Sequence, residues 1–220
     1  FGGWDLFHDN AYEAAVRAGV LENKLLDQLK DELAAIAPMP AVFEQAYVKN
    51  LKGDNIKRGT SKMDLADQLV DDIKRFQRDN GCDRLVAVWC GSTEVYRKPG
   101  EVHSTLARFE DGLRASSDDI APSQIYAYAC LKLGVPYCNG APNLSVDTPA
   151  LLELARRNRV PVGGNWSYPF PGGFPGGYTD HRFKVRTEAT DGVSLYQVPI
   201  AARTFYFDAG APAPGIVRPD

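Results

Sequence analysis

The chain has 220 residues, of which 44% are hydrophobic and 24% charged, and its net charge at neutral pH is −3. This is the composition of an ordinary globular protein, and it excludes the clustered excess of Lys and Arg with which proteins bind nucleic acids. No signal peptide opens the chain, and no run approaches the roughly 18 apolar residues of a membrane span, so we expect no membrane partner.

Cysteine and histidine usage argues against a metal centre. The three histidines lie far apart, and the four cysteines, Cys82, Cys90, Cys130 and Cys138, lack C-x-x-C spacing. We therefore expect free thiols and no metal site in a cytosolic protein, because disulfides are rare in that compartment.

Residues 1–162 alternate helical and strand patterns. In chain order these predict a strand closed by Asp5, helices over 11–20, 22–36 and 62–80, a strand over 84–90, helices over 104–115 and 122–134, a strand over 135–138, a helix over 149–157 and a strand over 160–162. The alternation predicts an α/β fold with a mostly parallel sheet and flanking helices. The nearly continuous apolar run RLVAVWC is typical of a strand covered on both faces.

The composition changes at Gly163. The last 58 residues contain nine Gly and seven Pro, about 28%, against about 12% in residues 1–162. Such a content is typical of irregular chain, although VSLYQVPIAARTFYF still predicts two β segments and DAGAPAPGIVRPD a disordered tail. We expect two parts: a folded domain over 1–162 and a Gly/Pro-rich tail over 163–220.

Candidate ligand groups follow three of the predicted strands, where open α/β sheets bind ligands. Asp5 closes the first strand, Gly91, Ser92 and Thr93 follow the strand that ends at Cys90, and Gly140 follows the next. Each group also fits an ordinary turn or cap, but three at equivalent positions favour a nucleotide site.

Other polar groups are interpreted as structural. GGFPGG is not a phosphate loop, because it lacks the G-x-G-x-x-G spacing and opens no helix. The pair Asp71 and Asp72 lies near Lys74 and Arg75 and predicts a solvated helix face, while Glu101 and His103 are expected at the surface or at a helix cap.

Long segments of the chain resemble one family. GGWDLFHDNAYEAAVRAGVLE, PMPAVFEQAYVKNLKGDN, DRLVAVWCGSTEVY, IAPSQIYAYACLKLGVPYCNGAPNLSVDTPALLELAR and VPV, in this order, resemble inositol-3-phosphate synthase of the prokaryotic type over about residues 1–164. The resemblance implies a Rossmann-type NAD domain within a tetrameric isomerase of inositol and phospholipid biosynthesis. That enzyme converts glucose 6-phosphate to myo-inositol 3-phosphate, and NAD accepts a hydride and returns it.

The resemblance also implies which residues contact NAD. Carried over by position, they are Asp5, Cys90, Gly91, Ser92, Thr93 and Gly140. Ser92 stands where eukaryotic relatives have Asn. No catalytic residue is assigned.

Two departures from the family pattern concern activity. The glycine-rich turn that cradles the pyrophosphate is expected before Phe1, and the lysine-bearing segment after the last strand is replaced by NWSYPFPGG. Lys184 is the only lysine after Gly163. We therefore expect an incomplete Rossmann-like sheet and a fragment with impaired activity. Two alternatives stay open: another NAD(P)-dependent sugar oxidoreductase, or a non-catalytic fragment that associates with partner subunits through exposed sheet edges.

Overall fold

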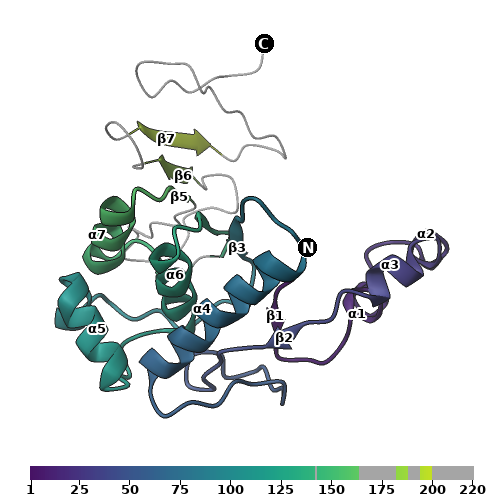
Figure 1. Cartoon of the computed structure of the whole chain (residues 1–220), viewed down its shortest axis with the longest axis horizontal. Helices are drawn as coiled ribbons and strands as arrows, with labels where there is room; N and C mark the ends of the chain where they lie inside the picture. The colour runs from purple at the N-terminus through teal and green to yellow at the C-terminus, as the bar shows by residue number, and fades with distance from the viewer. Residues whose placement is uncertain (142, 164–181, 188–193, 200–220) are drawn as a thin grey trace, which may run out of the picture.

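The computed structural model describes residues 1–141 and 143–163 and, for the backbone alone, residues 182–187 and 194–199. Short parallel strands and the helices packed against them make up the first 163 residues (Figure 1). This arrangement confirms the predicted α/β class with a mostly parallel sheet.

The strands up to residue 163 form two separate parallel sheets. In one, β1 (Trp4–Asp5) pairs with β2 (Met39–Pro40). In the other, β4 (Tyr137–Asn139) lies between β3 (Ala87–Trp89) and β5 (Val162–Gly163). Strand β2 was not predicted, because Pro38 precedes it and Pro40 lies within it, and prolines argue against a strand.

The helices are α1 (Ala11–Ala18), α2 (Asn23–Asp27), α3 (Lys30–Ala34), α4 (Lys62–Asp79), the 3₁₀ helix η1 (Glu101–His103), α5 (Leu106–Arg114), α6 (Pro122–Lys132) and α7 (Pro149–Asn158). Local capping starts several of them, as the sequence predicts. The side chain of Asn10 caps α1 and that of Ser61 caps α4, each accepting a backbone N–H three residues on.

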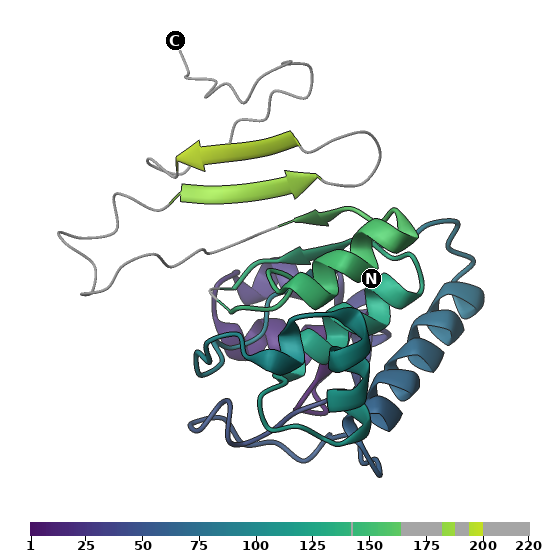
Figure 2. The same ribbon diagram turned by 90° about the vertical axis from the view of Figure 1, so that its left-hand side faces the viewer.

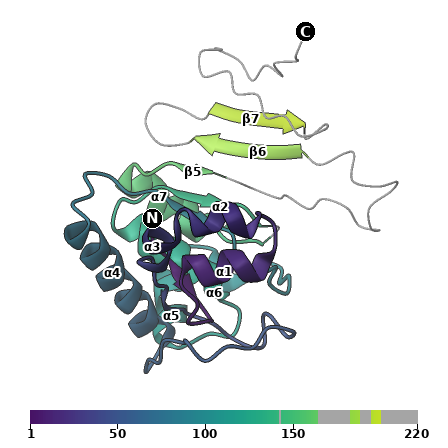
Figure 3. The same cartoon turned by 90° about the vertical axis from the view of Figure 1, so that its right-hand side faces the viewer.

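The prediction of a single helix over 22–36 is wrong, because the helix is interrupted between α2 and α3. These helices project with α1 from the rest of the domain as an arm (Figure 1), and Figure 3 shows α1, α2 and α3 side by side as seen from the end of this arm. Leu26 is the only buried residue of α1 to α3. Helical propensity alone stabilises a long helix poorly in water, and few side chains of this segment pack against the rest of the protein.

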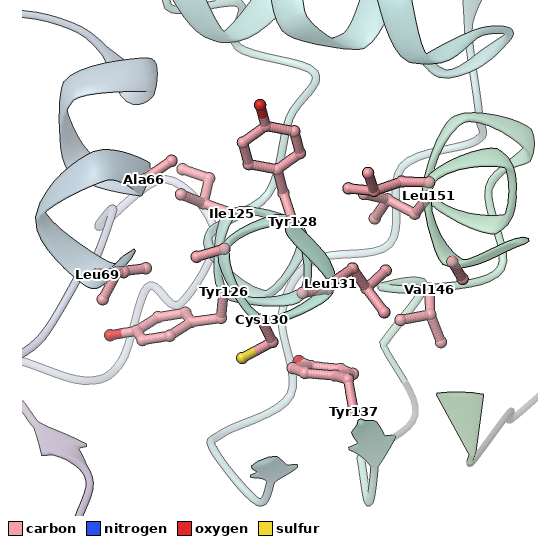
Figure 4. Packing of buried hydrophobic residues seen from close by; sticks show 14 of the residues in the cluster. Ala66, Leu69, Ile125, Tyr126, Tyr128, Cys130, Leu131, Tyr137, Val146 and Leu151 are labelled. Carbon is pink, nitrogen blue, oxygen red and sulfur yellow. The ribbon is translucent and has the colours of Figure 1, made fainter. Parts of the chain in front are cut away.

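Helix α6 is the centre of the core. Every residue from Pro122 to Leu131 is buried, as expected for an apolar helix enclosed by other elements. Figure 4 shows α6 end-on, with Leu69 of α4 on one side, Leu151 of α7 on the other and Tyr137 of β4 beneath it. The strand ends are therefore positioned against one rigid element.

Within the described residues, the sheet of β3, β4 and β5 has helices packed on one face only. Residues Val86 and Val88 are 69% and 61% exposed, so the prediction of a strand covered on both faces is wrong. The reason is that α4, α6 and α7 all lie on the same side of β3 to β5 (Figure 4).

In the C-terminal part, β6 (Arg182–Thr187) pairs antiparallel with β7 (Ser194–Pro199) (Figure 2). β7 lies within VSLYQVPIAARTFYF, for which two β segments were predicted, whereas β6 was not predicted. The second β segment predicted in VSLYQVPIAARTFYF and the tail DAGAPAPGIVRPD lie outside the described residues.

Candidate functional site

β1 and β3, together with the residues that precede and follow them, line one cavity of about 500 Å³. Tyr126 of α6 lies between the two strands, with its ring centroid 5.2 Å from that of Trp4 and 5.3 Å from that of Trp89. Because both strands rest on the same ring, the turns that leave them open into the same space.

Four of the six predicted cofactor residues line this cavity: Asp5, Cys90, Gly91 and Ser92. The structure therefore brings together two turns that are 85 residues apart in the chain. Thr93 lies just outside, in an adjoining hollow that it shares with Ser92.

Asp5 is exposed and orders its own turn. Its Oδ1 accepts a hydrogen bond from the backbone N–H of Phe7 at 3.0 Å, and its backbone carbonyl accepts one from Asn55 Nδ2 at 3.0 Å. The other carboxylate oxygen stays available as an acceptor at the mouth of the cavity.

The turn after β3 is compact and rich in free donors. A Cβ on Gly91 would lie 2.9 Å from the ring of Trp89, so the backbone folds closely over that indole. The backbone N–H groups of Gly91, Ser92 and Thr93 meet no acceptor within the described residues, and all three residues are exposed. Consecutive free N–H groups in a turn are suited to anionic or carbonyl oxygens.

Gly140 is placed behind this turn and does not line the cavity. Its N–H donates to the carbonyl of Trp89 at 2.8 Å, and a Cβ on Gly140 would lie 2.9 Å from the same oxygen. The residue therefore joins the turn after β4 to the turn after β3, which is a supporting position.

A buried ionic cluster anchors β1 beside the cavity. Trp4 Nε1 donates to Asp72 Oδ2 at 2.8 Å, and Lys57 Nζ lies 2.7 Å from the same oxygen. Asp72 is 3% exposed, so the prediction of a solvated face is wrong for this residue. It is right for the exposed Asp71. The prediction failed because the partners Trp4 and Lys57 belong to distant segments.

Two further buried polar residues were missed or misplaced by the sequence prediction. Glu94 is buried beside the cavity, and its position directly after Gly-Ser-Thr was the only signal for it in the sequence. His103 is buried and not at the surface, although its Nδ1 accepts from the N–H of Gly100, as expected for a cap.

The indole of Trp89, which lines the cavity, has an N–H group that is unpaired among the described residues. Trp89 Nε1 is buried and finds no hydrogen-bond partner in the described part of the chain. A buried donor without a partner is costly, and the turn at Gly91 packs closely over the same ring. The free N–H groups of residues 91–93 and the mostly apolar lining of the cavity fit a ligand with polar oxygens and an apolar portion.

The described residues contain no group of three or more His, Cys, Asp or Glu placed to hold a metal ion. The four cysteines are free, as predicted. Nowhere in the described residues does a helix have the length and apolar character needed to cross a membrane.

Comparison with known proteins decides the family. The NAD-binding family model described as myo-inositol-1-phosphate synthase matches residues 1–167. The chain belongs to the myo-inositol-1-phosphate synthase family. Because the matched model is an NAD-binding one, NAD is the cofactor that membership of this family indicates.

Individual relatives agree with this assignment. Inositol-3-phosphate synthase 1 of Bacteroides thetaiotaomicron is 45% identical over 165 residues, which are 74% of this chain and 38% of that protein. Inositol-3-phosphate synthase of Brassica napus is 32% identical over 169 residues, 75% of this chain and 33% of that protein. The chain thus spans about a third of the length of these relatives.

A solved structure shows the same fold. The crystal structure of inositol-3-phosphate synthase from Caenorhabditis elegans superimposes with a TM-score of 0.70 at 29% identity, over 74% of this chain and 32% of that one. The Rossmann-like class is therefore confirmed at the level of the three-dimensional fold as well as the sequence.

Proposed function

We propose that residues 1–163 bind NAD at the carboxyl ends of β1 and β3. The observation that carries this proposal is the single cavity of about 500 Å³ lined by Asp5, Cys90, Gly91 and Ser92, in a chain whose family model is an NAD-binding one. Its volume lies within the range of small-molecule and cofactor sites.

Each residue has a definite task in this proposal. The Asp5 carboxylate accepts hydrogen bonds from ribose hydroxyls, which is the common use of an acid at such a strand end. The N–H groups of Gly91, Ser92 and Thr93 donate to cofactor oxygens, and Gly91 lets the cofactor approach the backbone. Cys90 contributes apolar contact, and Gly140 holds the turn from behind.

We propose that the chain is part of an inositol-3-phosphate synthase, an isomerase that converts glucose 6-phosphate to myo-inositol 3-phosphate, within a cytoplasmic homotetramer that supplies phospholipid synthesis. When bound, NAD accepts a hydride from the sugar and returns it later in the turnover. The residues of this chain orient the cofactor, and the rings of Trp4, Trp89 and Tyr126 exclude water from one side of it.

The 220 residues alone are expected to turn over substrate at a negligible rate. No Lys or Arg is found among the described residues that line the cavity, where Asp5 and Glu94 are the acidic residues. An aldol cyclisation develops negative charge on oxygen, and nearby positive charge is the usual means of stabilising it.

Two measurements test these proposals separately. Calorimetric titration with NAD should show binding, and Asp5→Asn should weaken it about tenfold, whereas Asp54→Asn, an exposed acid that does not line the cavity, should not. Absence of NAD binding contradicts the site. An assay of inositol phosphate formed from glucose 6-phosphate and NAD should give no product above background, and clear product contradicts the expected inactivity.

One alternative has an observation in its favour. Val88 on β3, Val86 just before that strand, and Val20 and Leu21 on the arm are exposed apolar residues, and such surfaces mark contacts with other chains. A fragment that only associates with partner subunits predicts no NAD binding and concentration-dependent sedimentation. A sugar oxidoreductase instead predicts net accumulation of NADH, since it does not return the hydride.

A further inference from the structure

Glu94 is a buried carboxyl at the end of the turn that we assign to the cofactor. The residue is 7% exposed and follows Thr93 directly. One carboxyl oxygen accepts from the backbone N–H of Ser123 at 2.8 Å, and the other lies 2.5 Å from the Ser123 hydroxyl. Because Ser123 lies in the first turn of α6, the carboxyl ties the turn to the rigid central helix.

The backbone of Glu94 is held from a second side. Its N–H donates to Asn143 Oδ1 at 2.9 Å, and the carbonyl of Asn143 accepts from Asn139 Nδ2 at 2.7 Å. Asn139 is the last residue of β4. Glu94 is therefore the residue at which the turn after β3, the turn after β4 and the start of α6 are joined.

Charged and titratable groups surround this carboxyl on several elements. Burial raises the pKa of Glu94 to about 7, while hydrogen bonds from Ser123 and the charge of Lys62 act in the opposite direction and Glu44 adds to the rise. The phenols of Tyr47, Tyr126 and Tyr137 also interact electrostatically with it, and burial raises their own pKa values. The Ser123 hydroxyl is able to donate to a carboxylate or accept from a carboxylic acid, so the connection persists in either state.

We propose that Glu94 is a positioning residue, whose carboxyl holds residues 90–93 in the conformation that faces the cofactor. The proposal rests on the proposed function only in naming NAD as that cofactor. Glu94 itself acts through the turn, since its carboxyl oxygens are engaged by Ser123.

Amide hydrogen exchange in the free protein tests the holding role without any ligand. Glu94→Ala should raise the exchange rate of the amides of residues 94 and 95 about tenfold, because the turn loses its attachment to α6. Ser123→Ala removes the hydroxyl alone and should give a smaller rise of the same kind, and it serves as the probe if Glu94→Ala does not fold. Glu94→Gln should stay within about threefold of the parent, because its amide oxygen accepts from the Ser123 N–H and its NH₂ donates to the hydroxyl.

A matched control separates positioning from general loss of stability. Leu113→Ala empties a fully buried position on α5 and lowers the melting temperature without touching the turn. The exchange of residues 94 and 95 should be unchanged in this variant at a temperature where all variants are folded. An equal rise in Leu113→Ala and Glu94→Ala overturns the proposal, and so does an unchanged rate in both Glu94→Ala and Ser123→Ala.

Calorimetric titration with NAD completes the test. Glu94→Ala should raise the Kd for NAD about tenfold, Glu94→Gln should restore the parent value to within about threefold, and Leu113→Ala should leave it unchanged. A Kd that does not change in Glu94→Ala overturns the proposal. If the parent protein binds no NAD, the proposed function fails, and hydrogen exchange still decides whether Glu94 holds the turn.

Discussion

The backbone N–H of Gly140 donates to the backbone carbonyl of Trp89 across a distance of 2.8 Å. This contact joins the turns that follow β4 and β3, and only a residue without a side chain allows it, because a Cβ at position 140 would lie 2.9 Å from that carbonyl oxygen. The direct contact between these two backbone groups therefore determines the spacing of the two turns.

Gly140→Ala should push the two turns apart. The obstacle is a backbone oxygen that has no flexible end to move, so we expect a loss of about 1–3 kcal/mol in the free energy of unfolding and a weaker Kd for NAD. Urea unfolding and calorimetry measure the two effects. Gly100→Ala is the matched control, because a Cβ there meets nothing within 4 Å. Equal effects of the two substitutions would contradict the close approach.

Asp72 gives a second stability prediction. Asp72→Asn should lower the free energy of unfolding by about 3–5 kcal/mol, because the buried ammonium of Lys57 loses its counter-charge. The neighbouring Asp71→Asn changes the same charge at an exposed position and should cost less than about 0.5 kcal/mol. Urea unfolding of both variants is the measurement. A similar loss in the two would show that the Asp72 cluster contributes nothing beyond surface electrostatics.

The order of elements was predictable because it rests on local periodicity. The helix over 62–80 and the apolar strand before Cys90 carry their signal in adjacent residues, and they appear as α4 and β3. The break between α2 and α3 was not predictable, because propensity is continuous there and only the lack of packing partners ends the helix. The open face of β3 was missed for the same reason, since burial depends on which helices cover it.

The candidate site, too, was predictable only where its signal is local in the sequence. The turns at Asp5 and at residues 90–93 were predictable because they follow strand patterns directly, although β1 and β3 belong to separate sheets and meet through Tyr126 of α6. The partners that fix those turns lie far away in the chain: Asp72 for Trp4, and Ser123 and Asn143 for Glu94. No local pattern of one sequence reveals such pairs.

Cys90 provides a chemical test of the NAD site. Its thiol is exposed and lines the cavity, whereas Cys130 is buried and its pKa is raised to about 12 by burial. Iodoacetamide should therefore modify Cys90 in the folded protein and spare Cys130, since the thiolate is the reactive species.

Saturating NAD should slow the modification of Cys90 several-fold. Cys82, which lies outside the cavity, serves as the internal control, and mass spectrometry of the peptides measures all three sites.

Protection of Cys90 without protection of Cys82 supports contact between NAD and the turn after β3. Equal rates for Cys90 with and without NAD, under conditions where calorimetry shows binding, would place the cofactor elsewhere.

The carboxyl of Glu94 should make stability depend on pH in an unusual direction. Burial raises its pKa from 4.5 to about 7 in the folded protein, whereas the unfolded chain keeps the ordinary value. Between these two values the folded state holds a proton that the unfolded state has released, so the free energy of unfolding falls as pH rises. The fall should amount to at most about 3 kcal/mol and should be complete a little above pH 7.

Glu94→Gln has no proton to lose, and every other group titrates alike in both proteins, so the difference between their unfolding free energies isolates this carboxyl. Urea unfolding of both proteins at a series of pH values should show the parent losing stability relative to Glu94→Gln as pH rises, and a difference that stays constant would mean that Glu94 is ionised throughout.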